Sequence, residues 1–474
     1  ILLALQRLNP SKSSGPDNLH PRILKECATE LATSLCLLFN KSLRLGQLPA
    51  EWKQANITPV FKKGVKSVIP NYRQISLLSI ISKLCERCVL RKLLPDLIQL
   101  LTSLQHGFTP GRSCVTQLLT VLHDLGSFLD AGDEIDVIYL DFSKAFDSVP
   151  HGRLLHKLKL FGIQGPLHAW FTDYLSLRSQ RVVIDGAFSS WSPVTSGVPQ
   201  GSILGPLLFL LYINDMPDVL NPSTSIALFA DDAKCYRVVR NQDDSATLQH
   251  DLSSVFNWSK VWGLSFNSKK CEILRVSRKR CNRLDNSVVE PYSIDGHPLA
   301  SVSSSKDLGI IVNNKLTWNL QISSVVAKAN KTLGFLHRHF GTSHIGPAHR
   351  KSLYLSLVRA HLGYACEIWA PQSSISDIRL LENVQRRATR FILNCSKDHH
   401  IRPDYKCRLI QLNLLPVSYW LECRDLCFAY KYLNGYFNLQ LDDFFKISSG
   451  RTRSCDDSLH LYPVHRYRTS LFRD

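Results

Sequence analysis

Two adjacent carboxylates are the residues best placed to do chemistry. Asp231 and Asp232 follow the apolar run Ile226–Ala230 without interruption. That run predicts a buried strand, which would hold both acids at the tip of a tight turn. Neighbouring carboxylates raise each other's pKa unless a cation neutralises them, so the pair favours a divalent metal over a simple acid–base dyad.

A third carboxylate lies upstream. The segment Asp136–Asp141 has the apolar pattern of a buried strand and ends in an acid, ahead of a helix that we expect to begin near Pro150. An acid at the end of a central strand and another at the tip of a neighbouring hairpin can share two metal ions roughly 3.5 to 4 Å apart. Such a site supports in-line phosphoryl transfer, and its oxygen ligands suit Mg²⁺, with Mn²⁺ as an alternative.

Two basic residues are placed to bind phosphates. Lys62 lies at the end of a predicted strand over residues 56–64, and Arg73 lies in a second strand-like segment, residues 71–78. A lysine and an arginine at two strand ends can clamp a triphosphate. The same spacing is also typical of two solvated turns, so the residues alone leave both interpretations open.

Two loops rich in glycine and proline separate the predicted elements. Residues 105–113 contain Arg112, and the flanking residues let the backbone approach a phosphate. Residues 196–206 contain Gln200, which can hydrogen-bond the edge or the backbone of a base. Each loop taken alone is also consistent with an ordinary connection.

Basic residues recur towards the C-terminus. Lys270 lies in the turn of a predicted strand over residues 264–274, where a lysine could protonate a pyrophosphate leaving group or simply be solvated. From about residue 315 the pattern is mainly helical. One predicted helix has an apolar face formed by Ile378, Leu381, Val384, Ala388 and Ile392 and a basic face formed by Arg379, Arg386 and Arg390. That basic face suits a phosphate backbone and equally suits plain protein surface.

The composition narrows the class of protein. The 474 residues can form two or three cores, and 57 Lys and Arg against 39 Asp and Glu give a net charge of +18, which suits a partner rich in phosphates. We expect no membrane span, because no apolar run reaches the necessary ~18 residues. Fourteen cysteines without a secretory signal predict reduced thiols in an intracellular compartment. For Cys85 and Cys88, core packing is a better interpretation than a zinc site.

Together these segments resemble the reverse transcriptases of non-LTR (LINE-type) retrotransposons over roughly residues 12–320. Leu140–Asp147 is similar to the family's first palm motif, Ser196–Pro206 to its second, and Phe229–Asp232 to its third. The resemblance implies an α+β, right-hand polymerase fold with fingers, a palm that carries an antiparallel sheet, and a helical thumb. The expected domains are an N-terminal extension with the fingers over 1–134, the palm over 135–314, the thumb and a following helical segment over 315–440, and an irregular tail over 441–474.

The resemblance also implies roles for single residues. The catalytic metal ligands would be Asp141, Asp231 and Asp232, joined by the backbone of Phe142. The residues that would bind the incoming nucleotide are Lys62, Arg73, Phe146, Gln200 and Gly201. Among these, Phe146 matches the steric gate that rejects a ribose 2′-OH. Lys270 fits the family's Asn-x-x-Lys element as a possible general acid, and the residues that would contact the template-primer are Arg112, Asp307 and Gly309.

The implied function is RNA-directed DNA polymerase: a primer 3′-OH is extended with dNTPs on an RNA template, with two Mg²⁺ ions, inside the cell in nucleus and cytoplasm. The chain departs from the family at Gln74, where a proline is usual. We recognise neither an endonuclease domain nor a cysteine-rich knuckle, so we expect a fragment of a longer protein. The alternatives are a group II intron maturase-like polymerase, which predicts a different thumb, and a catalytically inactive, element-derived nucleic-acid-binding protein.

Overall fold

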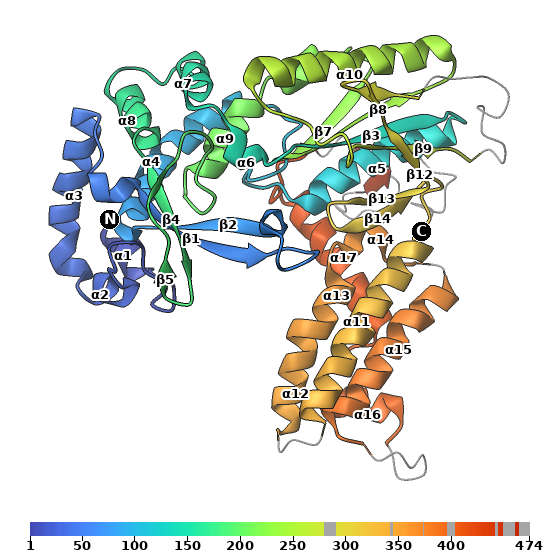
Figure 1. Ribbon diagram of the computed structural model, residues 1–474. Coiled ribbons are helices and arrows are strands. Elements are labelled where there is room, and N and C mark those ends of the chain that lie inside the picture. Colours follow the sequence, from blue (N-terminus) through green and yellow to red (C-terminus); the bar gives the residue numbers. More distant parts are fainter. Residues whose placement is uncertain are drawn as a thin grey trace.

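The computed structural model describes residues 1–278, 291–341, 345–372, 374–395, 403–440, 444–448 and 460–463. Figure 1 shows three parts: N-terminal helices around one sheet, a second sheet covered by helices, and a bundle of helices that extends away from both sheets. This arrangement matches the predicted fingers, palm and thumb, and these names are used for the three parts below.

The palm sheet has five strands in the order β12 (Ala300–Val302), β9 (Glu272–Val276), β3 (Ile135–Asp141), β8 (Asp232–Val238) and β7 (Ser225–Phe229). Strand β3 pairs antiparallel with both β8 and β9, and β7 pairs antiparallel with β8, whereas β12 runs parallel to β9. The two predicted strands that end in acids are therefore neighbours in one largely antiparallel sheet.

Helices cover both faces of the palm sheet. Helix α10 (Gln242–Trp262) lies on one face and α5 (Cys114–Asp130) on the other (Figure 1). Because successive residues of a strand point to opposite faces, Ile138 of β3 packs in the core that includes α10, and Val137 packs in the core that includes α5. The acids at the strand end are thus placed by a strand that is buried on both faces.

The fingers sheet is built from segments far apart in the sequence. Its strands are β2 (Tyr72–Leu78), β1 (Gln54–Phe61), β4 (Ser179–Ile184) and β5 (Ala187–Phe188), and β6 (Ser192–Pro193) pairs with β4. Strand β4 pairs in parallel with β1. Residues 179–193 fall in the range predicted as palm but belong to the fingers sheet, because this pairing uses backbone hydrogen bonds between distant segments, which local periodicity does not report.

Eight helices in the described part of the fingers and the palm pack in one hydrophobic core together with α10 and the face of the palm sheet that α10 covers. These helices are α1 (Leu2–Gln6), α2 (Pro21–Glu26), α3 (Ala28–Leu45), α4 (Ile80–Leu97), α6 (Ala145–Ser148), α7 (His151–Leu160), α8 (Gly165–Leu175) and α9 (Gly205–Ile213). Helix α7 begins directly after Pro150, as the sequence predicted, and α10 ends at Gly263, whose φ of +70° closes the helix.

The thumb is a bundle of α11 (Asn319–Phe340), α12 (Pro347–Leu353), α13 (Arg359–Gly363), α14 (Cys366–Trp369), α15 (Ile375–Ile392), α16 (Tyr405–Leu412) and α17 (Val417–Leu433). The predicted apolar face of α15 is confirmed at Leu381, Val384, Ala388 and Ile392, which are buried. Single helical turns lie at Ala50–Lys53, Ile69–Asn71, Ile98–Leu100, Met216–Val219 and Tyr354–Val358.

Two-stranded hairpins complete the fold: β10 (Ser293–Ile294) with β11 (His297–Pro298), β13 (Ser304–Asp307) with β14 (Ile310–Asn313), and β15 (Phe445–Ser448) with β16 (His460–Pro463). The last pair of strands falls in the tail predicted as irregular, of which only residues 444–448 and 460–463 are described.

Twelve cysteines lie in the described part of the chain, and all of them are free thiols. Cys85 is buried in α4, in agreement with core packing. Across the described residues, no helix combines the length and the apolar character needed to cross a membrane.

Candidate active site

The palm sheet brings the three predicted acids together. Asp141 is the last residue of β3 and Asp232 the first residue of β8, and they are direct partners in the antiparallel register. Asp231 lies in the tight turn between β7 and β8, next to Ala230, whose φ is +54°. Apolar strands of matched length thus place acids 90 residues apart in sequence at one edge of the sheet.

The acids perturb one another electrostatically. Burial, followed by the charge of Asp141, raises the pKa of Asp231. Partial burial, followed by the charges of Asp231, Asp141 and Asp307, raises the pKa of Asp232 to about 6. Because the charges of neighbouring carboxylates contribute to both raised pKa values, a cation bound at this corner of the palm would relieve their repulsion.

Two cations of the fingers partly offset that charge. Arg73 in β2 and Lys62 in the β1–β2 turn both act to lower the pKa of Asp231 through their charges. Both side chains are exposed. Both residues lie at the strand ends where the sequence predicted them. The positive charges of this hairpin therefore act on Asp231.

Lys270 contacts the first acid directly. Its Nζ lies 2.7 Å from Oδ2 of Asp141. The same segment is fastened to the end of β3, because the Asn267 N–H donates to the carbonyl of Asp141 (2.8 Å) and Phe142 pairs with Phe266 in an isolated bridge. The structure therefore brings this lysine to the first of the acids.

Phe146 and the predicted nucleotide loop lie between the fingers and the palm. The ring of Phe146 stacks on Phe209 of α9, with centroids 4.4 Å apart. The carbonyl of Gln200 accepts a bond from the Ser76 N–H of β2 (2.8 Å). Gly201 has a φ of +123°, and a Cβ there would stand 2.6 Å from the Ser76 carbonyl oxygen. A glycine is therefore required where the loop meets the fingers sheet.

The three residues predicted to contact the template-primer have other partners here. Arg112 donates to the backbone carbonyls of Ser103 and Gln105 in its own loop. Asp307 is buried and forms an ion pair with Lys234, which also donates to Gln117 (2.9 Å). Gly309, with φ +95°, packs against Tyr364 of the thumb, whose hydroxyl donates to the Leu308 carbonyl (2.7 Å).

The sequence reasoning missed the Lys234–Asp307 pair. Lys234 is only 2% exposed and stands two residues after Asp232. The pair joins β8 to the β13–β14 hairpin, so the hairpin is tied to the strand that begins with Asp232. A lysine within an apolar strand was the signal that could have revealed it, because a buried lysine needs a buried acid.

Glu86, between Cys85 and Cys88, was also missed. Its carboxylate is 1% exposed and accepts the N–H groups of Ile203 (2.7 Å) and Leu204 (3.1 Å), at the start of α9. Burial raises its pKa. An acid at a helix N-terminus is favourable because it meets unpaired N–H groups there, so Glu86 fixes the loop that carries Gln200.

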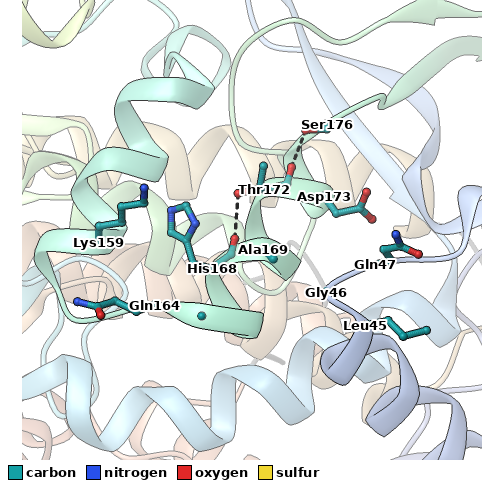
Figure 2. Close-up of a pocket in the computed structure, with 11 residues that line it drawn as sticks. Leu45, Gly46, Gln47, Lys159, Gln164, His168, Ala169, Thr172, Asp173 and Ser176 are labelled. Atoms are coloured by element: carbon teal, nitrogen blue, oxygen red, sulfur yellow. Dashed lines mark hydrogen bonds between the residues drawn. The ribbon is translucent and has the colours of Figure 1, made fainter.

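The described part of the surface has two hollows, and only one of them is lined by the predicted acids. One, of about 130 Å³, is lined in part by Asp141, Asp232, Lys270 and Asp307. A larger one, of about 830 Å³, lies between the end of α3 and helices α7 and α8 (Figure 2).

The larger hollow contains none of the predicted site residues. Its Thr172 and Ser176 hydroxyls donate to helix carbonyls, drawn as dashed lines in Figure 2. The carboxylate of Asp173 in this hollow accepts hydrogen bonds from the Lys53 Nζ (2.7 Å) and the Leu48 N–H (2.6 Å). We therefore place the candidate active site at the smaller, acidic hollow.

The donor chemistry at the acidic edge fits Mg²⁺. Carboxylate oxygens are the protein ligands that Mg²⁺ prefers, and repulsion among Asp141, Asp231 and Asp232 contributes to the raised pKa values of the adjacent pair. Within the described ranges, no three or more His, Cys, Asp or Glu side chains already converge as a metal-binding group. Magnesium is usually bound by one or two carboxylates together with substrate phosphates, so the donor set is sufficient.

Comparison with known proteins identifies the family. The model for the family "Reverse transcriptase (RNA-dependent DNA polymerase)" matches residues 60–312. A probable RNA-directed DNA polymerase from transposon X-element of Drosophila melanogaster is 28% identical over 400 residues, which cover 82% of this chain and 43% of that protein. A probable RNA-directed DNA polymerase from transposon BS of the same species is 29% identical over 412 residues, which cover 83% of this chain and 44% of that protein.

A third relative, the RNA-directed DNA polymerase from mobile element jockey of Drosophila melanogaster, is 28% identical over 397 residues, covering 80% of this chain and 42% of that protein. The chain thus spans less than half the length of these relatives. The family match extends over more than half of the 474 residues and includes the three acids, Phe146 and Lys270. The chain therefore belongs to the reverse transcriptase family.

Proposed function

We propose that this chain is the polymerase part of an RNA-directed DNA polymerase from a non-LTR retrotransposon. The observation that carries the proposal is the pairing of Asp141 with Asp232 across β3 and β8, with Asp231 in the adjoining turn. Three carboxylates at one sheet edge, faced by cations from the fingers, suit phosphoryl transfer from a nucleoside triphosphate.

Asp141 and Asp231 would hold two Mg²⁺ ions, with Asp232 and the backbone carbonyl of Phe142 in support; Mn²⁺ suits the same oxygen donors. When bound, such ions lower the barrier to attack on a phosphate by stabilising negative charge on the attacking and leaving oxygens. Asp231 is the stronger candidate of the adjacent pair, because the charges of Arg73 and Lys62, the proposed triphosphate ligands, reach it and lower its pKa.

The residues around the acids bind and orient the nucleotide. Arg73 and Lys62 bind the triphosphate of the dNTP, and the ring of Phe146 excludes a ribose 2′-OH. Gln200 and Gly201 shape the pocket where the fingers sheet meets the loop before α9. The primer 3′-OH attacks the α-phosphate, and Lys270 supplies a proton to the departing pyrophosphate.

The RNA template and DNA primer lie along the palm and thumb. The net charge of +18 supplies the attraction for their phosphates, and the basic residues of α15 lie on the side of that helix away from its buried face. Gly309 and Asp307 shape the hairpin beside the primer, and Arg112 shapes the loop before α5. The protein acts inside the cell, in nucleus and cytoplasm, where template RNA and target DNA occur.

A primer-extension assay tests the proposal. The protein is incubated with an RNA template, an annealed DNA primer, dNTPs and Mg²⁺, beside the variant Asp231→Ala. We expect extension by the wild-type protein and a loss of at least about 1000-fold in the variant, because removing a charge-stabilising ligand costs several kcal/mol of barrier. Equal extension by both proteins, or none by either, overturns the proposal and leaves the inactive nucleic-acid-binding alternative.

A further inference from the structure

The loop before α5 lies against the turn that carries the catalytic acids. The His106 N–H donates to the Leu228 carbonyl (2.9 Å), and the Leu228 N–H donates to the Leu104 carbonyl (3.1 Å). Gln105 pairs with Leu228 in an isolated parallel bridge. Residues 104–106 therefore extend the palm sheet beyond β7, next to Asp231.

The side chain of Gln105 holds that turn. It is 2% exposed, and its Oε1 accepts the N–H groups of Ala230 (2.9 Å) and Gly107 (2.7 Å). Ala230 has a φ of +54°, a conformation that L-residues rarely adopt. Because Ala230 directly precedes Asp231, this single amide oxygen fixes the backbone where the acids leave the strand.

Gly107 lets the loop approach this closely. A Cβ at this position would stand 2.4 Å from the nitrogen of Ala230 and 2.9 Å from the carbonyl carbon of Phe229. Those atoms belong to the backbone of the catalytic turn, so a side chain at residue 107 would force that backbone or the loop to shift. The contact between loop and turn therefore depends on the absence of a side chain at residue 107.

The next residue, Phe108, reaches the proposed gate. Its ring meets the ring of Phe146 edge to face, with centroids 6.2 Å apart and planes at 81°. Phe108 is 59% exposed and has a φ of +54°. A bulky residue in this conformation costs free energy that neighbouring contacts must offset, and such strain concentrates at functional sites.

Phe146 is therefore held from two sides. Phe209, a fully buried residue of α9, stacks on it from the core, with planes at 21°. Phe108 contacts it from the solvent side. Since Phe209 belongs to the rigid interior, the loop residue is the part of this arrangement that can set the tilt of the gate.

We propose that residues 104–108 position the catalytic turn and the gate as one unit. Gln105 is the positioning residue for Asp231, and Phe108 is the positioning residue that orients Phe146 towards the sugar of the incoming nucleotide. This inference rests on the proposed function, since it requires nucleotides to bind beside Phe146. Under this proposal, discrimination between deoxyribose and ribose depends on residues 104–108, which lie outside the three palm motifs.

The first experiment compares dNTP and rNTP incorporation by Phe108→Ala. The kcat/KM values for dATP and ATP opposite a template uracil give a discrimination ratio. We expect this ratio to fall about 2- to 10-fold, the range that corresponds to the loss of one aromatic pair. Phe108→Tyr keeps the ring and should keep the ratio.

The matched control is Phe188→Ala, because Phe188 is 58% exposed and lies on β5 of the fingers sheet. It should leave the ratio at the wild-type value. A ratio unchanged within twofold in Phe108→Ala, or an equal change in Phe188→Ala, overturns the assignment of Phe108. The melting temperature of each variant shows whether folding is preserved, which the exposure of Phe108 and Phe188 favours.

The second experiment separates positioning from stability at Gln105. Gln105→Met removes the acceptor at similar volume, and Gln105→Glu retains an acceptor oxygen. Well below the melting temperature, we expect Gln105→Met to lower kcat about tenfold while the KM for dNTP stays within threefold, and Gln105→Glu to recover part of kcat. A kcat within twofold of wild type in Gln105→Met overturns the role of Gln105.

The activity of the wild-type protein separates failure of the proposed function from failure of the positioning role. If the wild-type protein extends no primer, the proposed function falls and this inference falls with it. If the wild-type protein is active but the loop variants keep their discrimination ratio and kcat, only the positioning role is wrong.

Discussion

The ammonium of Lys270 lies 2.7 Å from a carboxylate oxygen of Asp141, the acid that ends the central strand of the palm. Both side chains keep substantial exposure, 50% for the lysine and 35% for the aspartate. Solvent screens such a pair, so it contributes little to stability. Its placement at the acidic edge is better explained by a role in the reaction than by a role in folding.

Substitution of Lys270 should therefore affect the rate and not the fold. We expect Lys270→Gln to lower the single-turnover rate of dNTP incorporation about 100-fold, since general acids typically contribute 10²- to 10⁴-fold. Its melting temperature should stay close to that of the wild type. Lys269→Gln, a change at the exposed neighbouring lysine, is the control. A rate for Lys270→Gln within twofold of wild type would rule out the general-acid role.

Removal of the fingers cations should weaken nucleotide binding. Arg73 and Lys62 are exposed, and their charges reach Asp231. Loss of one charge-assisted contact to a phosphate is expected to raise the KM for dNTP about 10-fold in Arg73→Ala and somewhat less in Lys62→Ala, because arginine can bind in a bidentate manner.

Steady-state incorporation at varied dNTP concentration measures this effect. Lys41→Ala, an exposed change on α3, serves as the control and should leave KM unchanged. An unchanged KM in both fingers variants would contradict the predicted triphosphate clamp and favour the solvated-turn interpretation.

A methyl group at Gly107 should disturb both stability and activity. Gly107→Ala forces a Cβ to within 2.4 Å of the Ala230 nitrogen, and overpacking of this kind costs about 1–3 kcal/mol. Urea unfolding followed by circular dichroism measures the change in the free energy of unfolding.

The control for that experiment is Gly152→Ala, the same substitution at a glycine that has free space around it. Gly152 lies in α7, and no atom stands within 4 Å of its added Cβ. Alanine is the better helix former, so this variant should gain about 0.5–1 kcal/mol. If Gly107→Ala were as stable and as active as wild type, the close packing of loop and turn would be wrong.

His106 should make stability depend on pH. Burial, helped by the charges of Arg112 and Lys234, lowers the pKa of its imidazole from the ordinary 6.5 to about 3. Below pH 6.5 the unfolded chain binds a proton that the folded chain excludes until about pH 3. The free energy of unfolding should therefore decrease as the pH falls from 6.5 towards 3, by at most roughly 1.4 kcal/mol per pH unit from this group.

Comparison with His106→Gln isolates this contribution from the titration of carboxylates in the same range. The difference between wild type and variant should change below pH 6.5 and stay constant above it. A difference that does not vary with pH would show that the imidazole is not held neutral in the fold.

Much of the fold followed from local patterns. The apolar runs before Asp141 and before Asp231 predicted the buried strands β3 and β7, and the 3.6-residue spacing predicted α15. These predictions succeeded because the buried faces of a helix or strand determine the spacing of its apolar and polar residues along the sequence.

The sequence by itself determined which side chains can react: three acids at strand ends, cations in turns and an aromatic residue five positions after the first acid. Only the tertiary structure decided their partners. It joined β4 to β1 across the domain boundary predicted from the sequence, buried Asp307 against Lys234, and placed Gln105 on Ala230, 125 residues away. The physical reason is that periodicity reports whether a residue is buried but not against what, and backbone groups pair without regard to side-chain identity.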